Sequence, residues 1–222
     1  HMSKHHVAQG LIARGNRVCF WGPSQEEKGT VHLKEEDGLR TVHTRHWFKG
    51  VNRMPTAVNK WYYGRMIRAI EGKAGAPFDI VWCFDTSRLQ WFPDGHWFKL
   101  LHLVDYDILY HGHGLMRSAD LIVTTADIIN DKVRTIAPNA RIEKVGHALD
   151  PRWTANNGSL AEERTGPPRT AVYAGQFFNT YIDFDALVKV AESHPSISFS
   201  FVGTYVADFP NAGFQRLRTL PN

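Results

Sequence analysis

The sequence predicts an α/β protein in which one domain with a parallel sheet leads into a second such domain. The order of segments between residues 118 and 175 carries this prediction. Residues 121–124 form an apolar run that is too short for a helix and is bounded by polar residues, as expected of a buried strand. An amphipathic segment follows at 127–136, and a further strand begins at Ile142. After a polar interval with glycine and proline, a new strand begins at Thr170.

The amphipathic segment at 127–136 is predicted to be a helix. Thr125 or Asp127 would cap its first turn, and Pro138 would stop it. Its apolar residues recur near helical spacing, with charged residues between them. These apolar residues are Ile128, Val133 and Ile136.

The first elements of the chain are predicted to be a helix at 4–14, ended by Gly15-Asn16, and a strand at 17–21. In a doubly wound sheet the strand before this helix lies near the centre. We expect either upstream residues or another element to supply it. Alternating residues at 29–44 around Asp37-Gly38 predict a hairpin.

The remaining elements follow from the same patterns. Residues 56–71 predict an amphipathic helix ended by Gly72 and Gly75. Its apolar side chains are Val58, Trp61, Tyr62, Met66, Ile67 and Ile70. Buried strands are expected at 79–84 and 98–104, and after the polar interval a helix at 184–193 and a strand at 197–202.

Composition limits the class of protein. The chain has 222 residues, enough for one large or two small domains, and its 43% hydrophobic content suffices for a core. There is no run of roughly 18 apolar residues of the kind that spans a membrane. Cys19 and Cys83 lie in apolar runs and are expected to be buried thiols, which suits a reducing cytoplasm. The net charge of +4 favours anionic partners. His1-Met2 is interpreted as a cloning remnant.

The run SADLIVTTADIINDKVRTIAPNARIEKVGHALDPRW, followed by VYAGQF, resembles the interdomain region of group 1 GT-B glycosyltransferases. Gly146-His-Ala-Leu-Asp150 stands where Asn-Gly-Val-Asp is usual, which looks closer to the xanthan-type glucuronosyltransferase branch. The resemblance implies a GT-B-like fold of two Rossmann-like domains. The first, at 3–150, would face the acceptor; a linker at 151–169 and a partial donor-nucleotide domain at 170–222 would follow. Both ends of the fold are expected to be truncated.

The resemblance implies an enzyme of polysaccharide biosynthesis. It would move a sugar from a nucleoside-diphosphate sugar to a glycan or lipid-linked acceptor, without a metal or other cofactor and without nucleic acid. The expected location is the cytoplasm, at the inner face of the membrane if the contact described below exists. Two alternatives stay open: a nucleotide-sugar epimerase of the same architecture, and a non-catalytic module that binds nucleotide or glycan.

Asp105 follows a predicted strand, and ligands of open α/β sheets bind beyond the carboxyl ends of strands. A carboxylate there can take the proton of an acceptor hydroxyl, so Asp105 is the candidate base, with Asp107 as the nearest substitute. The alternative is that Asp105 caps the next helix. His5 and His147 are candidates for binding in the cleft, and for His147 packing at the hinge is the alternative. The resemblance implies the positions of Asp105 and His5.

Donor binding is expected after the first strand of the second domain. A glycine at position 175 lets the backbone approach a diphosphate, and Gln176 and Phe177 follow it. Gln176 stands where many relatives of the GT-B type have arginine. Gly203 ends the next strand and is a second candidate. For both glycines the alternative is a plain turn.

The stretch from Arg45 to Arg68 is rich in aromatic and basic residues. Such a stretch suits peripheral contact with a membrane, with Trp47, Phe48 and Trp61 inserted at the interface. For Trp61 the favoured interpretation is packing in the core.

Overall fold

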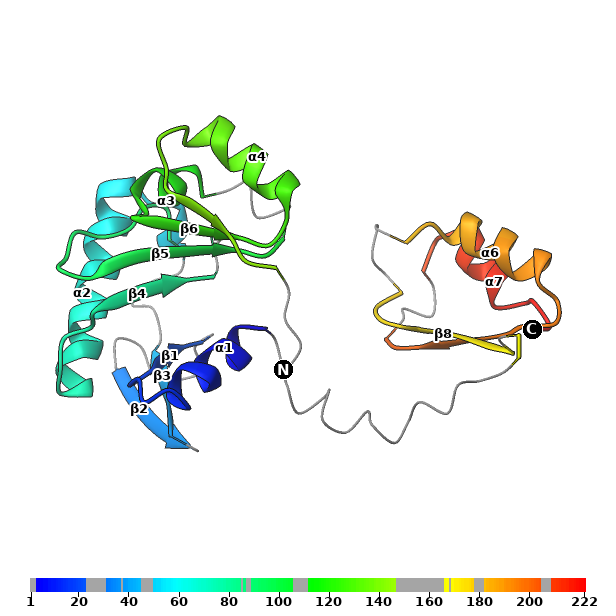
Figure 1. Cartoon of the computed structure of the whole chain (residues 1–222), viewed down its shortest axis with the longest axis horizontal. Helices are drawn as coiled ribbons and strands as arrows, with labels where there is room; N and C mark the ends of the chain where they lie inside the picture. Colours follow the sequence, from blue (N-terminus) through cyan, green and yellow to red (C-terminus); the bar gives the residue numbers. More distant parts are fainter. Residues whose placement is uncertain are drawn as a thin grey trace. The chain divides into compact units, whose positions relative to one another are not determined.

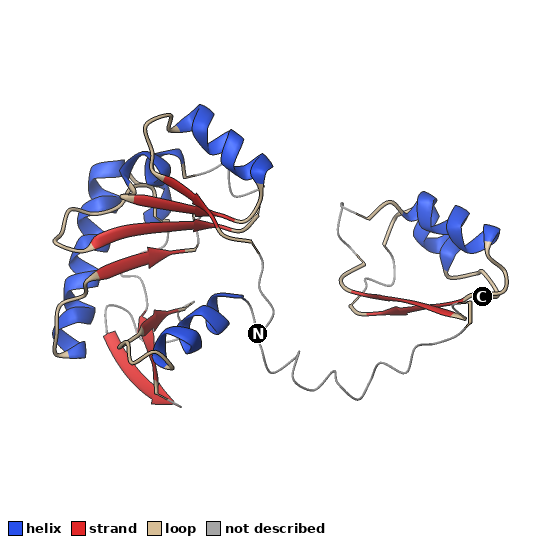
Figure 2. Cartoon of the chain, viewed as in Figure 1, coloured by secondary structure: helices blue, strands red, loops and turns tan. Residues whose placement is uncertain are grey.

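The chain divides into two units, His1–Thr154 and Ala155–Asn222 (Figure 1). The computed structural model describes residues 3–22, 31–36, 38–44, 50–84, 86, 89–105, 112–146, 166–167, 169–177, 182–204 and 209–222. Figure 2 shows helices and strands in both units. The predicted α/β fold class is confirmed.

A four-stranded parallel sheet forms the larger part of the first unit. Its strands are β4 (Ile80–Cys83), β5 (Phe98–Leu103), β6 (Leu121–Thr124) and β7 (Ile142–Lys144), in the order β4-β5-β6-β7. Each strand pairs in parallel with its neighbour, so all four carboxyl ends lie at one edge. One face of the sheet packs against helices α2 (Thr56–Ala74), α3 (His113–Ser118) and α4 (Asp127–Ile136). The core between them includes the fully buried side chains of Leu101, Leu103, Leu115, Met116, Ile122 and Val133.

A second sheet in this unit has the order β1-β3-β2. Strand β1 (Cys19–Trp21) runs parallel to β3 (Leu39–Thr44), and β2 (Val31–Glu36) pairs antiparallel with β3. Glu36 faces Leu39 across the turn, and Gly38 has a φ of 75°. Because only two residues connect the strands and one has positive φ, the predicted Asp-Gly hairpin is confirmed. Helix α1 (Ser3–Ile12) precedes this sheet.

Two predictions for helix α2 are wrong, at Gly72 and at Trp61. Gly75, with a φ of 75°, caps its C-terminus, whereas Gly72 lies within the helix and does not end it. Trp61 is 57% exposed, so its predicted place in the core is wrong. Four other residues of the predicted apolar stripe are buried as expected: Tyr62, Met66, Ile67 and Ile70. The rings of Tyr62 and Tyr63 meet edge to face, with centroids 5.4 Å apart.

Helix α4 has the predicted bounds but a different cap, and one residue of its predicted face is exposed. Its N-cap is Ala126, which makes no side-chain hydrogen bond, so the predicted caps by Thr125 or Asp127 are wrong. The Thr125 hydroxyl donates to the Val104 carbonyl instead, at 3.1 Å. Ile128 is 62% exposed, whereas the next residue, Ile129, is buried in the core. Val133 is fully buried and Ile136 packs against the core, so the predicted face is wrong only at Ile128.

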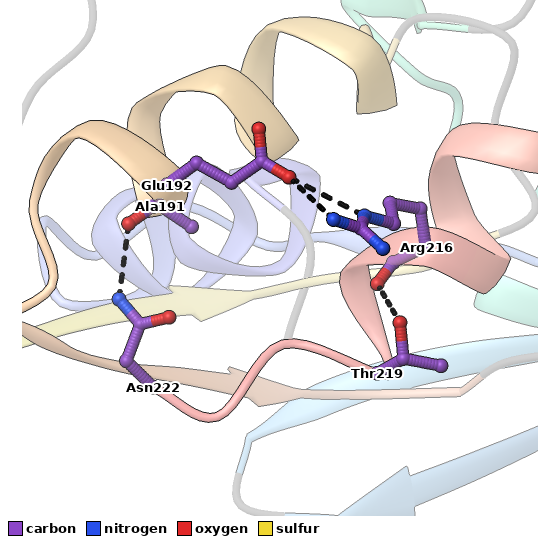
Figure 3. Close-up of polar contacts among 5 residues, drawn as sticks. All are labelled: Ala191, Glu192, Arg216, Thr219 and Asn222. Carbon is purple, nitrogen blue, oxygen red and sulfur yellow. Dashed lines mark hydrogen bonds and ion pairs between the residues drawn. The ribbon is translucent and has the colours of Figure 1, made fainter.

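The second unit contains a two-stranded parallel sheet of β8 (Thr170–Ala174) and β9 (Ser198–Val202). Helices α6 (Phe184–Ser193) and α7 (Ala212–Leu217) pack against it around a cluster of phenylalanines. The Asp183 carboxylate caps α6 by accepting from the Ala186 amide at 2.9 Å. Figure 3 shows two polar ties: Arg216 of α7 pairs with Glu192 of α6 at 3.1 Å, and the Asn222 amide donates to Ala191.

The two cysteines of the chain are Cys19 and Cys83. Cys19 and Cys83 carry thiols that are only half-buried, so their predicted burial is partial. Burial still raises the pKa of the Cys19 thiol, against the opposing effect of the nearby Arg40. Among the described helices, none has the length and apolar character needed to span a membrane.

Candidate functional site

Asp105 lies two residues beyond the end of β5, an inner strand of the four-stranded sheet, and is exposed. The hydrogen bond from Thr125 to the carbonyl of Val104 joins the chain just before Asp105 to the segment that follows β6. The next described helix, α3, has Gly112 as its N-cap and makes no side-chain cap hydrogen bond. Asp105 therefore does not cap α3, and its carboxylate lies at the sheet edge where ligands of open α/β folds bind.

A pair of charged side chains, Asp127 and Lys144, lies at the same edge of the sheet as Asp105. The Lys144 ammonium, at the end of β7, donates to both oxygens of the Asp127 carboxylate, at 2.8 and 3.0 Å. Between β5 and β7, Thr124 ends β6 with its side chain fully buried. Sequence reasoning missed the pair, which joins the last residue of β7 to the first residue of α4. The pair fixes the start of α4 against the sheet, and a negative charge in the first turn suits the helix dipole.

The other candidates of the first unit are His5, Asp107 and His147. His5 lies in α1, half-buried, with its ring centroid 4.4 Å from that of Phe20. In Figure 1 the N-terminal end of α1 and the carboxyl ends of β4, β5 and β6 point to the same side of the unit. Asp107 and His147 lie outside the described residues. Within the described ranges, no three histidine, cysteine or acidic side chains are grouped as a metal site.

The predicted donor residues of the second unit come together where β8 and β9 end. The Gly175 amide donates to the Val202 carbonyl at 2.9 Å, and the Phe177 amide donates to the Thr204 carbonyl at 3.0 Å. These two bonds continue the parallel pairing past the last residues of both strands. Gln176, between them, is exposed.

The space around Gly175 and Gly203 shows whether a larger residue would fit at either position. A Cβ on Gly203, whose φ is 155°, would lie 1.6 Å from the Gly175 carbonyl oxygen. A Cβ on Gly175 would lie 2.6 Å from the Tyr173 hydroxyl. Glycine is therefore required at position 203 for the two loops to approach each other, before any ligand is considered. At position 175 the added Cβ would meet only the end of a side chain from the preceding strand.

A cavity of about 220 Å³ opens beside this loop contact. Its walls are mostly aromatic and aliphatic, and one cation lies at the border: Phe177, Phe201, Gly203, Phe214, Leu217 and Arg218. The Arg218 guanidinium lies over the Phe214 ring, 5.9 Å from its centroid. Apolar walls with one cation suit a flat ring attached to an anionic group. Sequence reasoning found Phe177 and Gly203 but missed Phe214 and Arg218, which come from α7 and the residue after it.

No protein-family model matches the chain, and no curated protein sequence gives a significant match. Two solved structures are similar to the chain. A sucrose-phosphate synthase from Thermosynechococcus elongatus is similar with a TM-score of 0.59 at 13% identity, over 97% of this chain and 59% of that one. A second structure of the synthase has a TM-score of 0.47 at 13% identity, over 71% of this chain and 90% of that one. The first likeness confirms the predicted GT-B-like fold, and the chain spans 59% of the length of that synthase.

Proposed function

We propose that this chain takes part in glycosyl transfer from a nucleoside-diphosphate sugar to a glycan or a lipid-linked acceptor. The observation that carries the proposal is the aromatic cavity with Arg218 at its border, beside the contact between Gly175 and Gly203. It lies at the carboxyl ends of two parallel strands, where open α/β folds bind nucleotides. The similar structure is named as a synthase of a sugar phosphate, which supports the same class of reaction.

On the donor side, the base would occupy the cavity against the rings of Phe177 and Phe214. The Arg218 guanidinium would pair with the diphosphate, the role that Gln176, which is uncharged, is unable to fill. In this proposal Gly175 and Gly203 act by holding the two loops at the distance that shapes the cavity. Gln176 is exposed next to them and would reach the ribose or the sugar.

On the acceptor side, Asp105 would act as the base. As the acceptor oxygen forms a bond to the anomeric carbon, the bond from that carbon to the diphosphate breaks and the nucleoside diphosphate leaves. The proton of the acceptor hydroxyl passes to the Asp105 carboxylate. His5 and the residues outside the described ranges, Asp107 and His147, would help to bind the acceptor. The reaction requires that an acceptor at Asp105 reaches the donor held by the second unit during turnover.

The test uses the intact chain with labelled nucleoside-diphosphate sugars, and it measures nucleotide release, sugar transfer and nucleotide affinity. We expect Asp105→Asn to abolish transfer and to leave nucleotide affinity unchanged. Asp131→Asn, an exposed acid on α4 away from the strand ends, is the matched control and should keep full activity. Unchanged turnover in Asp105→Asn would remove this residue from the mechanism.

The same assay separates the alternatives. Nucleotide binding without release of product from any donor would favour a non-catalytic binding module. Conversion of the donor sugar into its epimer, detected by chromatography of the hydrolysed sugar, would favour an epimerase. We further propose a cytoplasmic location, which the reduced thiols of Cys19 and Cys83 support.

A further inference from the structure

The outer face of α2 carries an unusual stripe of side chains. Val58, Trp61, Arg65 and Arg68 follow one another at intervals of three, four and three residues, and this spacing places them on one side of a helix. All four are exposed, with Val58 at 38% and Trp61 at 57%. We call these four residues the outer stripe. The opposite side of the helix is anchored in the core by Tyr63, Met66 and Ile70, among others.

The polarity of the outer stripe changes along the helix. Its N-terminal half is apolar, with an aliphatic side chain and a large aromatic ring one turn apart. Its C-terminal half consists of two arginines. Single exposed apolar residues are common on protein surfaces and need no explanation. A tryptophan followed by arginines one and two helical turns later is different, because it combines an amphipathic ring with fixed positive charge on one surface.

The surroundings leave the positive charge of the outer stripe uncompensated within α2. Glu71 is the only acidic residue of this helix. Its side chain is 11% exposed, and its carboxylate accepts from the Phe78 amide at 2.9 Å and lies 3.4 Å from the His96 ring nitrogen. Glu71 is therefore turned toward the body of the unit. The nearby Lys60 is paired with Asp94 at 2.8 Å, so that salt bridge is also complete without the arginines.

We propose that the outer stripe docks on the surface of an anionic lipid bilayer. The Trp61 ring and the Val58 side chain would enter the boundary between headgroups and acyl chains, where tryptophan is favoured. Arg65 and Arg68 would contact lipid phosphates, to which guanidinium groups bind by paired hydrogen bonds. Docking would hold the unit that carries Asp105 close to a lipid-linked acceptor. The inference goes beyond sugar transfer, and it stands or falls separately from it. Of the wider aromatic and basic stretch, residues 45–49 lie outside the described residues.

The experiment is co-sedimentation of the intact chain with phosphatidylcholine vesicles, with and without phosphatidylglycerol. We expect binding only to the vesicles that contain phosphatidylglycerol, and weaker binding as salt is added. The double variant Arg65→Gln and Arg68→Gln should bind roughly 30-fold more weakly, because each cation near an anionic surface contributes roughly fivefold. Trp61→Ala keeps both charges and should also lose binding.

The matched control is Lys132→Gln with Arg134→Gln, which removes two exposed cations from α4 and should bind as the unchanged chain does. Because all the substituted side chains are exposed, the variants should keep the circular dichroism spectrum of the parent. The proposal is overturned if the unchanged chain does not bind, or if the control loses as much as the outer-stripe variant. Binding that does not depend on Trp61 and is matched by heparin would also overturn it, in favour of a soluble polyanion.

Discussion

The contact between Gly203 and Gly175 gives the sharpest prediction of the structure. Gly203 has a φ of 155°, a backbone conformation that L residues rarely adopt. A Cβ added at this position would point at the Gly175 carbonyl oxygen. In Gly203→Ala the distance from Cβ to this oxygen must grow from 1.6 Å to at least 3.0 Å. The loops after β8 and β9 must therefore separate.

The cost follows from two contributions. A non-glycine residue in such a conformation costs about 1–3 kcal/mol. Separation of the loops breaks the bonds from the Gly175 amide to Val202 and from the Phe177 amide to Thr204. Each such bond contributes about 0.5–1.5 kcal/mol. We therefore expect Gly203→Ala to destabilise this pairing by about 2–6 kcal/mol, a large share of the stability of a small domain.

Peptide-resolved hydrogen exchange is the appropriate measurement. Peptides that cover 170–177 and 198–204 should exchange at least roughly 30-fold faster in Gly203→Ala, because about 1.4 kcal/mol corresponds to a factor of ten. Nucleotide affinity should fall with it, since Gly203 and Phe177 both line the cavity. Gly72→Ala is the control: nothing lies within 4 Å of the added Cβ, and the helix should gain about 0.5–1 kcal/mol. Unchanged exchange in Gly203→Ala would refute the reasoning.

Three further predictions concern the first unit. Asn59→Ala should lower the free energy of unfolding by about 2–4 kcal/mol in urea titrations, because the buried Asn59 amide donates to the Val51 carbonyl and accepts from the Gln90 amide. Ile129→Ala should cost about 2–5 kcal/mol in the same assay, whereas exposed Ile128→Ala should stay within about 0.5 kcal/mol; equal costs would contradict the observed face of α4. Burial raises the pKa of the Cys19 thiol, so less thiolate is present near neutral pH, and iodoacetamide should alkylate Cys19 more slowly than a free thiol. Mass spectrometry across a pH series would test this, and a rate equal to that of the free thiol would contradict it.

The sequence predicts well the elements whose pattern is local. The strand at 121–124 and the helices at 127–136 and 184–193 have the predicted bounds, because short apolar runs and amphipathic periodicity define them without help from the rest of the fold. The edges of a buried helical face were harder to predict. In α2 and α4 most of the predicted apolar residues are buried, but Trp61 and Ile128 are exposed, whereas their neighbours Tyr62 and Ile129 are buried. Neighbouring apolar residues on a helix differ by about 100° in direction, and only the tertiary partners decide between them.

The candidate sites show the same limit. Asp105, Phe177 and Gly203 were found because each follows a predicted strand, and the topology of parallel sheets gathers such residues at one edge. Arg218 and Phe214 follow no strand directly. They reach the cavity because α7 packs on α6 through phenylalanine contacts, such as that between Phe184 and Phe214 at 5.3 Å. Sequence patterns do not encode which surfaces of two helices meet, so these residues were missed.

The two hydrophobic cores explain why these experiments can be interpreted separately. The core of the first unit is built from residues between Val51 and Ala137, and that of the second from residues between Phe177 and Leu217, with no residue in common. A substitution that loosens the loops at Gly203 therefore has no packed path, within the described cores, to α2 or to β5. We expect Gly203→Ala to lose nucleotide affinity while vesicle binding is kept, and the outer-stripe variant to show the reverse. Joint loss of both properties in either variant would mean that the two units do not fold independently.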